Sequence, residues 1–247
     1  MKFLPLLLAL IIFIAISSAA VIEIEVKMKL DGKISFFSFE RMNNIVKAST
    51  EFYNTGSVAY KARARLDILN RSELIFSGWS EEKPLMPGER KTFEIYWYSP
   101  SKAKNLTARL RVYFGNEIVE ESKNLSIEYV KSSKDLFQIK NFRTYEDHIR
   151  FEIRANETLK NVIVVPSDYI QGWIFEQIKL RELKANKNTE VKIRYIPTVW
   201  MESQVKLNVF TEDGKYYFSK TFELKKEKGL LKYLHMIYDK LSLILNF

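Results

Sequence analysis

Few residues of this chain have the types and spacing that active-site chemistry requires. The chain contains two histidines and no cysteine, which excludes thiol catalysis, zinc fingers and multi-histidine metal centres. His148 and His235 are far apart in the sequence, so we do not expect them to share a metal ion or a proton relay. Neither a Gly-x-Ser-x-Gly elbow nor a Gly-x-x-x-x-Gly-Lys loop occurs. We therefore expect no enzyme activity, no metal and no cofactor.

Three pairs of adjacent carboxylates are the remaining candidates for acid–base chemistry. They are Glu81 with Glu82, Glu120 with Glu121, and Glu212 with Asp213. Neighbouring side chains on a β-strand point to opposite faces, whereas a catalytic pair must converge on one substrate. We interpret these residues as solvated surface, so an unrecognised hydrolase is the weakest functional hypothesis. Asp213 and Gly214 are expected to form a hairpin turn, because a calcium loop would need more oxygen ligands.

Aromatic side chains could bind sugars by stacking, but their positions favour packing. Trp97 has the same parity as Phe93 and Ile95, which predicts that it lies in the core. Tyr96 and Tyr98 have the opposite parity, so they are predicted to face solvent or a partner and are candidate binding residues. The remaining tryptophans, which we also assign to packing, are Trp79, Trp173 and Trp200.

Basic side chains provide the main candidate binding surface, because the formal net charge is +9 at pH 7. In an immunoglobulin-type strand order, a strand near residues 59–68 would lie beside one near residues 107–114. Their outward residues would form a basic stripe of Lys61, Arg63, Arg65, Arg109 and Arg111, with Tyr113 beside it. The preferred alternative is an ordinary charged face that glutamates such as Glu120 and Glu128 neutralise.

The N-terminus predicts export. Lys2 is followed by uncharged residues 3–16 and by Ser17, Ser18, Ala19 and Ala20, which is the order of an export signal. We prefer cleavage before Val21, and an uncleaved membrane anchor stays open because the uncharged run continues to residue 22. Both place the body at the outer face of the cell membrane or on the cell surface. There a membrane surface, an anionic glycan or a membrane protein is the expected partner, and nucleic acid is not.

Four acceptor sequons for N-glycosylation fit an exported chain. They begin at Asn70, Asn105, Asn124 and Asn156, which exceeds the roughly one or two expected by chance. Modified asparagines and unmodified surface loops both stay open. The abundance of Lys and Glu with little Gln also suggests a thermophilic or archaeal source.

The elements that must position these residues are β-strands, because polarity alternates with a period of two. Strands are predicted over residues 22–30, 60–68, 93–98, 108–114, 149–153, 162–165 and 191–195. Asp31 and Gly32 are predicted to turn the chain after the first of these strands. Short strands separated by short turns indicate a mainly β chain built from β-sandwiches.

Several short motifs of the first half recur in the second half with an offset of 94 to 97 residues. The matches are Gly78-Trp79 with Gly172-Trp173, Tyr98 and Pro100 with Tyr195 and Pro197, and Leu110, Val112 and Tyr113 with Leu207, Val209 and Phe210. The repeat predicts two tandem immunoglobulin-like β-sandwiches. The expected organisation is a signal or anchor over residues 1–20, sandwiches over residues 21–130 and 134–226 joined by a linker at 131–135, and a helix over residues 229–247.

The C-terminal segment changes from a strand period to a helical one. Its apolar face consists of Leu230, Leu234, Ile237, Leu241 and Ile244. This amphipathic helix is too short and too charged to span a bilayer, so we expect it to lie on a membrane or against a partner helix. Docking onto its own sandwich stays open as the alternative.

The first half resembles a known family. Asn54-Thr55-Gly56-Ser57 and Leu85-Met86-Pro87-Gly88-Glu89 resemble the Asn-Thr-Gly and Leu-x-Pro-Gly-Glu signatures of CARDB-like immunoglobulin-type modules, over roughly residues 45–129. The second half departs from this pattern at residues 185–188. Because such modules occur in exported archaeal and bacterial proteins, the resemblance implies a non-catalytic binding or assembly module of the cell surface. An accessory subunit or chaperone-like partner of a membrane complex is the alternative.

Overall fold

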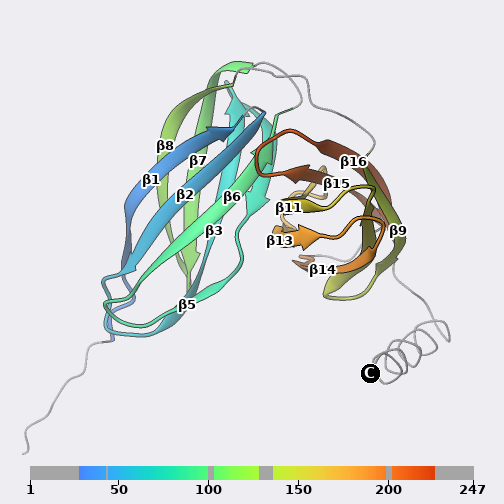
Figure 1. The fold of residues 1–247 in the computed structure, drawn as a ribbon. Coiled ribbons are helices and arrows are strands. Elements are labelled where there is room, and N and C mark those ends of the chain that lie inside the picture. The colour runs from blue at the N-terminus through green and yellow to red at the C-terminus, as the bar shows by residue number, and fades with distance from the viewer. Residues whose placement is uncertain (1–27, 43, 100–102, 128–135, 199–201, 226–247) are drawn as a thin grey trace, which may run out of the picture.

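A computed structural model of the protein describes residues 28–42, 44–99, 103–127, 136–198 and 202–225. The export segment, the linker at 131–135 and the helix expected over 229–247 lie outside the described residues, as do Glu128, Trp200 and His235. The regular elements of the described ranges are β-strands, and they form four antiparallel sheets (Figure 1). Within these ranges, no helix is long and apolar enough to cross a membrane.

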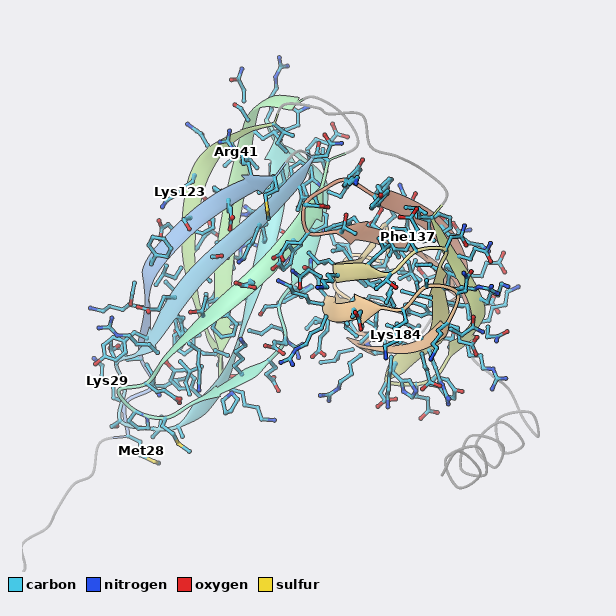
Figure 2. The ribbon with its side chains drawn as sticks, in the orientation of Figure 1. Met28, Lys29, Arg41, Lys123, Phe137 and Lys184 are labelled. Atoms are coloured by element: carbon cyan, nitrogen blue, oxygen red, sulfur yellow. The ribbon has the colours of Figure 1, made fainter. Side chains whose placement is uncertain are left out.

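The N-terminal half contains two sheets. Their strand orders are β1-β2-β6 and β4-β3-β7-β8, with β5 added to β3. The strands are β1 Gly32–Met42, β2 Ile45–Asn54, β3 Tyr60–Asn70, β4 Glu73–Trp79, β5 Lys83–Leu85, β6 Arg90–Tyr98, β7 Ala103–Phe114 and β8 Glu117–Ile127. The Lys123 ammonium of β8 donates to the Phe37 carbonyl of β1, which joins the edges of the two sheets. Figure 2 labels Lys123 on this side of the first half.

The C-terminal half repeats this strand order. Sheet β9-β10-β14-β12 matches β1-β2-β6, and sheet β13-β11-β15-β16 matches β4-β3-β7-β8. The strands are β9 Phe137–Thr144, β10 His148–Ala155, β11 Leu159–Ser167, β12 Ile174–Phe175, β13 Ile178–Leu183, β14 Asn188–Ile196, β15 Ser203–Thr211 and β16 Tyr217–Leu224. Both halves therefore have a β-sandwich-like arrangement, and they differ in that β5 pairs with β3 whereas β12 pairs with β14.

Alternating polarity correctly predicts most of the strands. The predicted strands at 60–68, 93–98, 108–114, 149–153, 162–165 and 191–195 fall within β3, β6, β7, β10, β11 and β14. In β3, Ala62, Ala64 and Leu66 are buried against the core of the first half, as inward positions of a half-buried strand should be. Both faces of β11 are buried, because Ile163 and Val165 face the first half of the molecule.

The predicted strand and turn at the start of the body are wrong in their described part. Residues 28–31 are not in a strand, and Gly32 is the first residue of β1. The Asp31 carbonyl accepts hydrogen bonds from the Gly56 N–H at 3.1 Å and the Tyr60 hydroxyl at 2.9 Å, which holds this segment as a loop. Gly32 is needed because a Cβ there would collide with the ring of Phe52.

Only one of the matched motifs occupies equivalent positions in the two halves. Tyr195 lies in the core of the second half, whereas Tyr98 faces away from the core of the first half and contacts Phe210 and Tyr217. A shift of one residue moves a side chain to the other face of a sheet, so this match is wrong. Trp173 is in the core, whereas Trp79 lies on the outer face of β4. The equivalent residues are Leu110 and Val112 in β7 and Leu207 and Val209 in β15.

Candidate functional site

The junction between the two halves buries the tyrosine predicted as a binding residue at the end of β6. The ring of Tyr98 stacks on Tyr217 with centroids 3.7 Å apart and an interplanar angle of 5°, and it also contacts Phe210 at 5.8 Å. Ile163, Val165 and Phe210 of the second half belong to the same buried cluster as the core of the first half. An apolar interface of this kind fixes the relative position of two domains.

Polar contacts surround this apolar centre. The Tyr96 N–H donates to Gln177 Oε1 at 2.7 Å, and Gln177 Nε2 donates to the Tyr96 carbonyl at 2.9 Å. Arg63 forms an ion pair with Glu176 at 3.2 Å, and the Tyr169 hydroxyl donates to the Ser77 carbonyl at 3.3 Å. Each of these bonds connects the first half to the second.

Neither Tyr96 nor Tyr98 faces solvent, because the second half covers them. Their exposed fractions are 4% and 7%. The Tyr96 hydroxyl lies within hydrogen-bonding distance of Glu94 at 3.1 Å and Glu212 at 3.2 Å. The surface that covers both tyrosines therefore belongs to the second half of the same chain and not to another protein.

Burial and nearby charges shift the pKa values of two carboxyl groups of the junction in opposite directions. Burial raises the pKa of Glu176 above its usual value, and the charge of Arg63 opposes this only in part. Burial also raises the pKa of Glu94, but the hydrogen bond and charge of Lys47, 2.8 Å away, outweigh it, so the net pKa is lowered. Burial and the charge of Glu94 raise the pKa of the Tyr96 hydroxyl.

The predicted basic stripe does occupy one sheet face, as the strand register requires. Arg65 is the cross-strand partner of Arg111, Arg63 of Tyr113, and Asp67 of Arg109. Residues opposite one another on antiparallel strands place their side chains on the same face.

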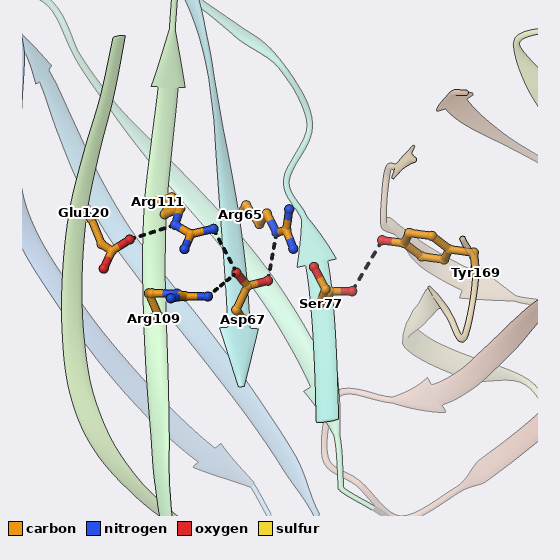
Figure 3. Close-up of polar contacts among 7 residues, drawn as sticks. All are labelled: Arg65, Asp67, Ser77, Arg109, Arg111, Glu120 and Tyr169. Carbon is orange, nitrogen blue, oxygen red and sulfur yellow. Dashed lines mark hydrogen bonds and ion pairs between the residues drawn. The ribbon is translucent and has the colours of Figure 1, made fainter. Parts of the chain in front are cut away.

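An acidic residue of the same face neutralises the stripe. Asp67 is fully buried and accepts a hydrogen bond from Arg65 Nε at 2.8 Å, with Arg111 at 3.4 Å and Arg109 at 3.5 Å (Figure 3). Arg111 also pairs with Glu120 at 2.7 Å, as the charged-face alternative predicted. The parity of Asp67 with Arg65 was the sequence signal that could have identified this cluster.

The other two basic residues are also paired. Lys61 pairs with Glu82 at 3.4 Å, and Arg63 is only 8% exposed. The described residues provide no hydrogen-bond partner for Nε of Arg63 or of Arg109. The face is thus a largely compensated array of guanidinium groups and not an open basic stripe.

A groove beside this array was not predicted from the sequence. It has a cavity volume of about 160 Å³ and lies between β4 and the segment 167–173, lined among others by Ile75, Trp79 and Tyr169. Trp79 packs between the Arg65 guanidinium at 5.3 Å and the Tyr113 ring at 5.1 Å. We call this cavity the junction groove. It is smaller than the roughly 300–1,000 Å³ of small-molecule sites and has room for one protein side chain.

The adjacent carboxylates do not converge on a common point. Glu81 pairs with Lys83 at 2.9 Å, Glu121 with Lys123 at 3.4 Å, and Glu212 with Lys179 at 2.6 Å. The expected turn at Asp213 and Gly214 is confirmed, because it connects β15 to β16 and the Gly214 N–H donates to the Thr211 carbonyl at 2.8 Å.

His148 and the acidic residues form no metal site in the described ranges. His148 Nδ1 lies 2.6 Å from Asp147, and its ring stacks on Tyr145. No group of three or more His, Asp or Glu residues there has an arrangement that could hold a metal ion.

Comparisons with known proteins place this chain in no family. No protein-family model matches it, and no curated protein matches it. Among solved structures, it is similar to the transglutaminase of red sea bream with a TM-score of 0.28 and 8% sequence identity, over 82% of this chain and 31% of that enzyme. At this TM-score the likeness identifies neither a common fold nor a common activity.

Proposed function

We propose that the chain is an exported, non-catalytic binding or assembly module of the cell surface, formed by two tandem immunoglobulin-like sandwiches of the CARDB-like type. The repeated strand order supports the tandem arrangement. The export signal read from residues 1–20 supports the location.

The fixed junction is the observation that carries this proposal. Tyr98, Phe210 and Tyr217 join the two halves through ring contacts, and the buried cluster continues across them. A rigid pair of domains presents surfaces from both halves in one constant geometry, which lowers the entropy cost of binding a partner. A catalytic role receives no comparable support, because the carboxylates and His148 have ordinary ion-pair or stacking partners.

The junction groove is the proposed partner site. Its lining combines Arg65, Trp79 and Tyr169 with the exposed apolar side chains of Leu74 and Ile75. Aromatic and arginine residues are enriched at protein interfaces, and a small pocket is suited to one anchoring side chain. A protein of a membrane or surface complex is therefore the proposed partner.

Photo-crosslinking of the full chain in exporting cells tests this proposal. A photoreactive amino acid at Ile75, which is 40% exposed, should capture one discrete membrane or surface protein. Ile118 is a matched control, because it is an exposed isoleucine on β8 of the same sheet. Leu74→Asp should abolish the product from Ile75. Equal capture from both positions, or none from Ile75, would contradict the proposal.

Binding to an anionic surface is the second candidate, supported by the side chains of Lys61 and Arg109, which remain 70% and 31% exposed beside their acidic partners. If these residues bind an anionic surface, Lys61→Gln combined with Arg109→Gln should weaken binding of the full chain to anionic vesicles. Added salt should also weaken binding of the unchanged chain. Unchanged binding would leave the array with a structural role.

A further inference from the structure

Three of the four sequons lie at one end of a single sheet. Asn70 ends β3, Asn105 lies near the start of β7, and Asn124 lies in β8. The register places Asn70 opposite Leu106, and Thr107 opposite Asn124. Because neighbouring strands are about 5 Å apart, the three asparagines lie within roughly three strand spacings of one another.

Each of these asparagines is accessible. Asn70, Asn105 and Asn124 are all exposed, and none of them has a hydrogen-bond partner for its side-chain amide among the described residues. Buried or partnered amides would be expected if the three residues served the fold. These three sequons therefore lie where a modifying enzyme can reach their asparagines.

Local backbone geometry accounts for the asparagine at one of these positions. Asn70 precedes a tight turn at Arg71, which has a φ of 58°. Asn105 has a φ of 58° next to a register shift between Ala103 and Leu106. Asparagine tolerates this conformation better than most residues, so the backbone explains an asparagine at 105. It does not explain the hydroxyl two residues later in all three sequons.

The fourth sequon has a structural explanation for its hydroxyl. Thr158 Oγ1 accepts a hydrogen bond from the Ala185 N–H at 3.1 Å. Threonine at this position therefore serves the fold, and the sequon at Asn156 need not reflect modification.

The directions of the side chains leave room for separate oligosaccharides. Asn124 shares the outer face with Thr107, because the two are cross-strand partners. Asn70 is the cross-strand partner of Leu106, so its side chain points toward the inner face of the sheet. Asn70 is nevertheless exposed, because it lies at the end of the sheet. Glycans on Asn70 and Asn124 would therefore leave the sheet in different directions.

We infer that Asn70, Asn105 and Asn124 are N-glycosylated and form a glycan-bearing end of the first half. The donor would be an oligosaccharide linked through phosphate to a membrane lipid, transferred by a membrane enzyme after export. The asparagine Nδ2 bonds to C1 of the first sugar, the bond from C1 to the phosphate oxygen breaks, the lipid phosphate leaves with the electron pair, and the amide loses one proton. Atoms and charge balance without an oxidant or reductant.

The position of these glycans restricts which surfaces can bind a partner. Asn70 is paired with Glu73, beside Leu74 at the outer end of the junction groove. A glycan at Asn70 would lie outside the Leu74 end of the groove and limit the approach of a partner from that side, while Trp79 and Tyr169 at the opposite end stay open. The inference rests on the export proposed above and not on the identity of a partner.

Mass spectrometry of the full exported chain tests this inference. The host must be one in which a second exported protein carries N-glycans, measured in the same cells. Intact mass should exceed that of the polypeptide, and glycopeptides should contain the three asparagines. Thr107→Val, Ser126→Ala and Ser72→Ala should each remove one glycan mass, whereas the matched variants Thr107→Ser, Ser126→Thr and Ser72→Thr should keep it. Hydroxyl variants are preferable to Asn105→Gln, because the backbone at 105 favours asparagine.

The outcomes separate this inference from the proposed function. An exported chain with the mass of the bare polypeptide, or with glycan at Asn156 alone, overturns the inference and leaves the binding module intact. A chain that stays in the cytoplasm overturns both, because this transfer requires export. A crosslinked partner at Ile75 on an unmodified chain would support the proposed function alone.

Discussion

The side-chain amide of Gln177 pairs with the main chain of Tyr96 in the way that a neighbouring strand would. It accepts from the Tyr96 N–H at 2.7 Å and donates to the Tyr96 carbonyl at 2.9 Å. Tyr96 lies in β6, which is an edge strand of sheet β1-β2-β6. Unpaired edges are templates for association with other chains, so Gln177 both joins the two halves and protects this edge.

Replacing Gln177 by Ala should destabilise the protein by about 1–3 kcal/mol, because it leaves a partly buried N–H and carbonyl of Tyr96 without partners. Urea unfolding of the full chain measures the effect. Gln171→Ala is the matched control, since Gln171 is exposed and should change stability by less than about 0.5 kcal/mol. Equal effects of the two substitutions would remove the special role of Gln177.

Gly78 allows this pairing, because a Cβ at Gly78 would lie 2.8 Å from Gln177 Nε2 and 2.6 Å from the ring of Phe76. Gly78→Ala should therefore displace Gln177 and cost about 1–3 kcal/mol. The cost of the double variant should be smaller than the sum of the Gly78→Ala and Gln177→Ala costs, because both disturb the Gln177 contact and only the collision with Phe76 is separate. Additive costs in a double-mutant cycle would show that Gly78 acts independently of Gln177.

The sequence pattern identified which face each strand residue occupies better than what covers that face. The parity of Phe93, Ile95 and Trp97 correctly predicted their burial. The same parity placed Tyr96 and Tyr98 on the outer face, which is correct, but it could not reveal that β11, β15 and β16 of the second half cover them. Contacts between domains depend on tertiary arrangement, which has no period in the sequence.

Charge patterns had a similar limit. The outward parity of Arg65, Arg109 and Arg111 was correct, but counting basic residues ignored where Asp67 would lie. A carboxylate at the centre of three guanidinium groups interacts with all three of them, whereas one at the edge of the stripe would interact with fewer. The sequence contained the parity of Asp67, and the convergence of the side chains required the register of β3 with β7.

Asp67→Asn should lower the free energy of unfolding by about 3 kcal/mol, because it removes the buried carboxylate that contacts all three guanidinium groups. This value is at the low end for buried ion pairs, since the arginine side chains remain partly hydrated. Glu120→Gln is the control, and it should cost less than about 1 kcal/mol because Glu120 is an exposed partner of Arg111. A loss for Asp67→Asn no larger than for Glu120→Gln would contradict this account.

The stability of the junction should depend on pH through Glu94. Its folded pKa lies below the usual value of 4.5, because the contacts with Lys47 outweigh burial. A carboxyl group with a lowered folded pKa contributes stability above its unfolded pKa and loses it as the pH falls through the folded value. Glu94→Gln should therefore reduce the loss of stability as the pH falls from neutral through 4.5 and on through the lowered folded pKa, measured by urea unfolding.

Glu176 should have the opposite effect. Burial raises its folded pKa above the usual value of 4.5 despite the ion pair with Arg63. In the window from its folded pKa down to 4.5, the folded state binds more protons than the unfolded state, so this group adds stability as the pH falls. Glu176→Gln removes that gain and should make the acid loss of stability steeper than in the unchanged chain. The two variants should thus move the pH dependence in opposite directions, and a shift in the same direction would mean that Arg63, rather than burial, controls the titration of Glu176.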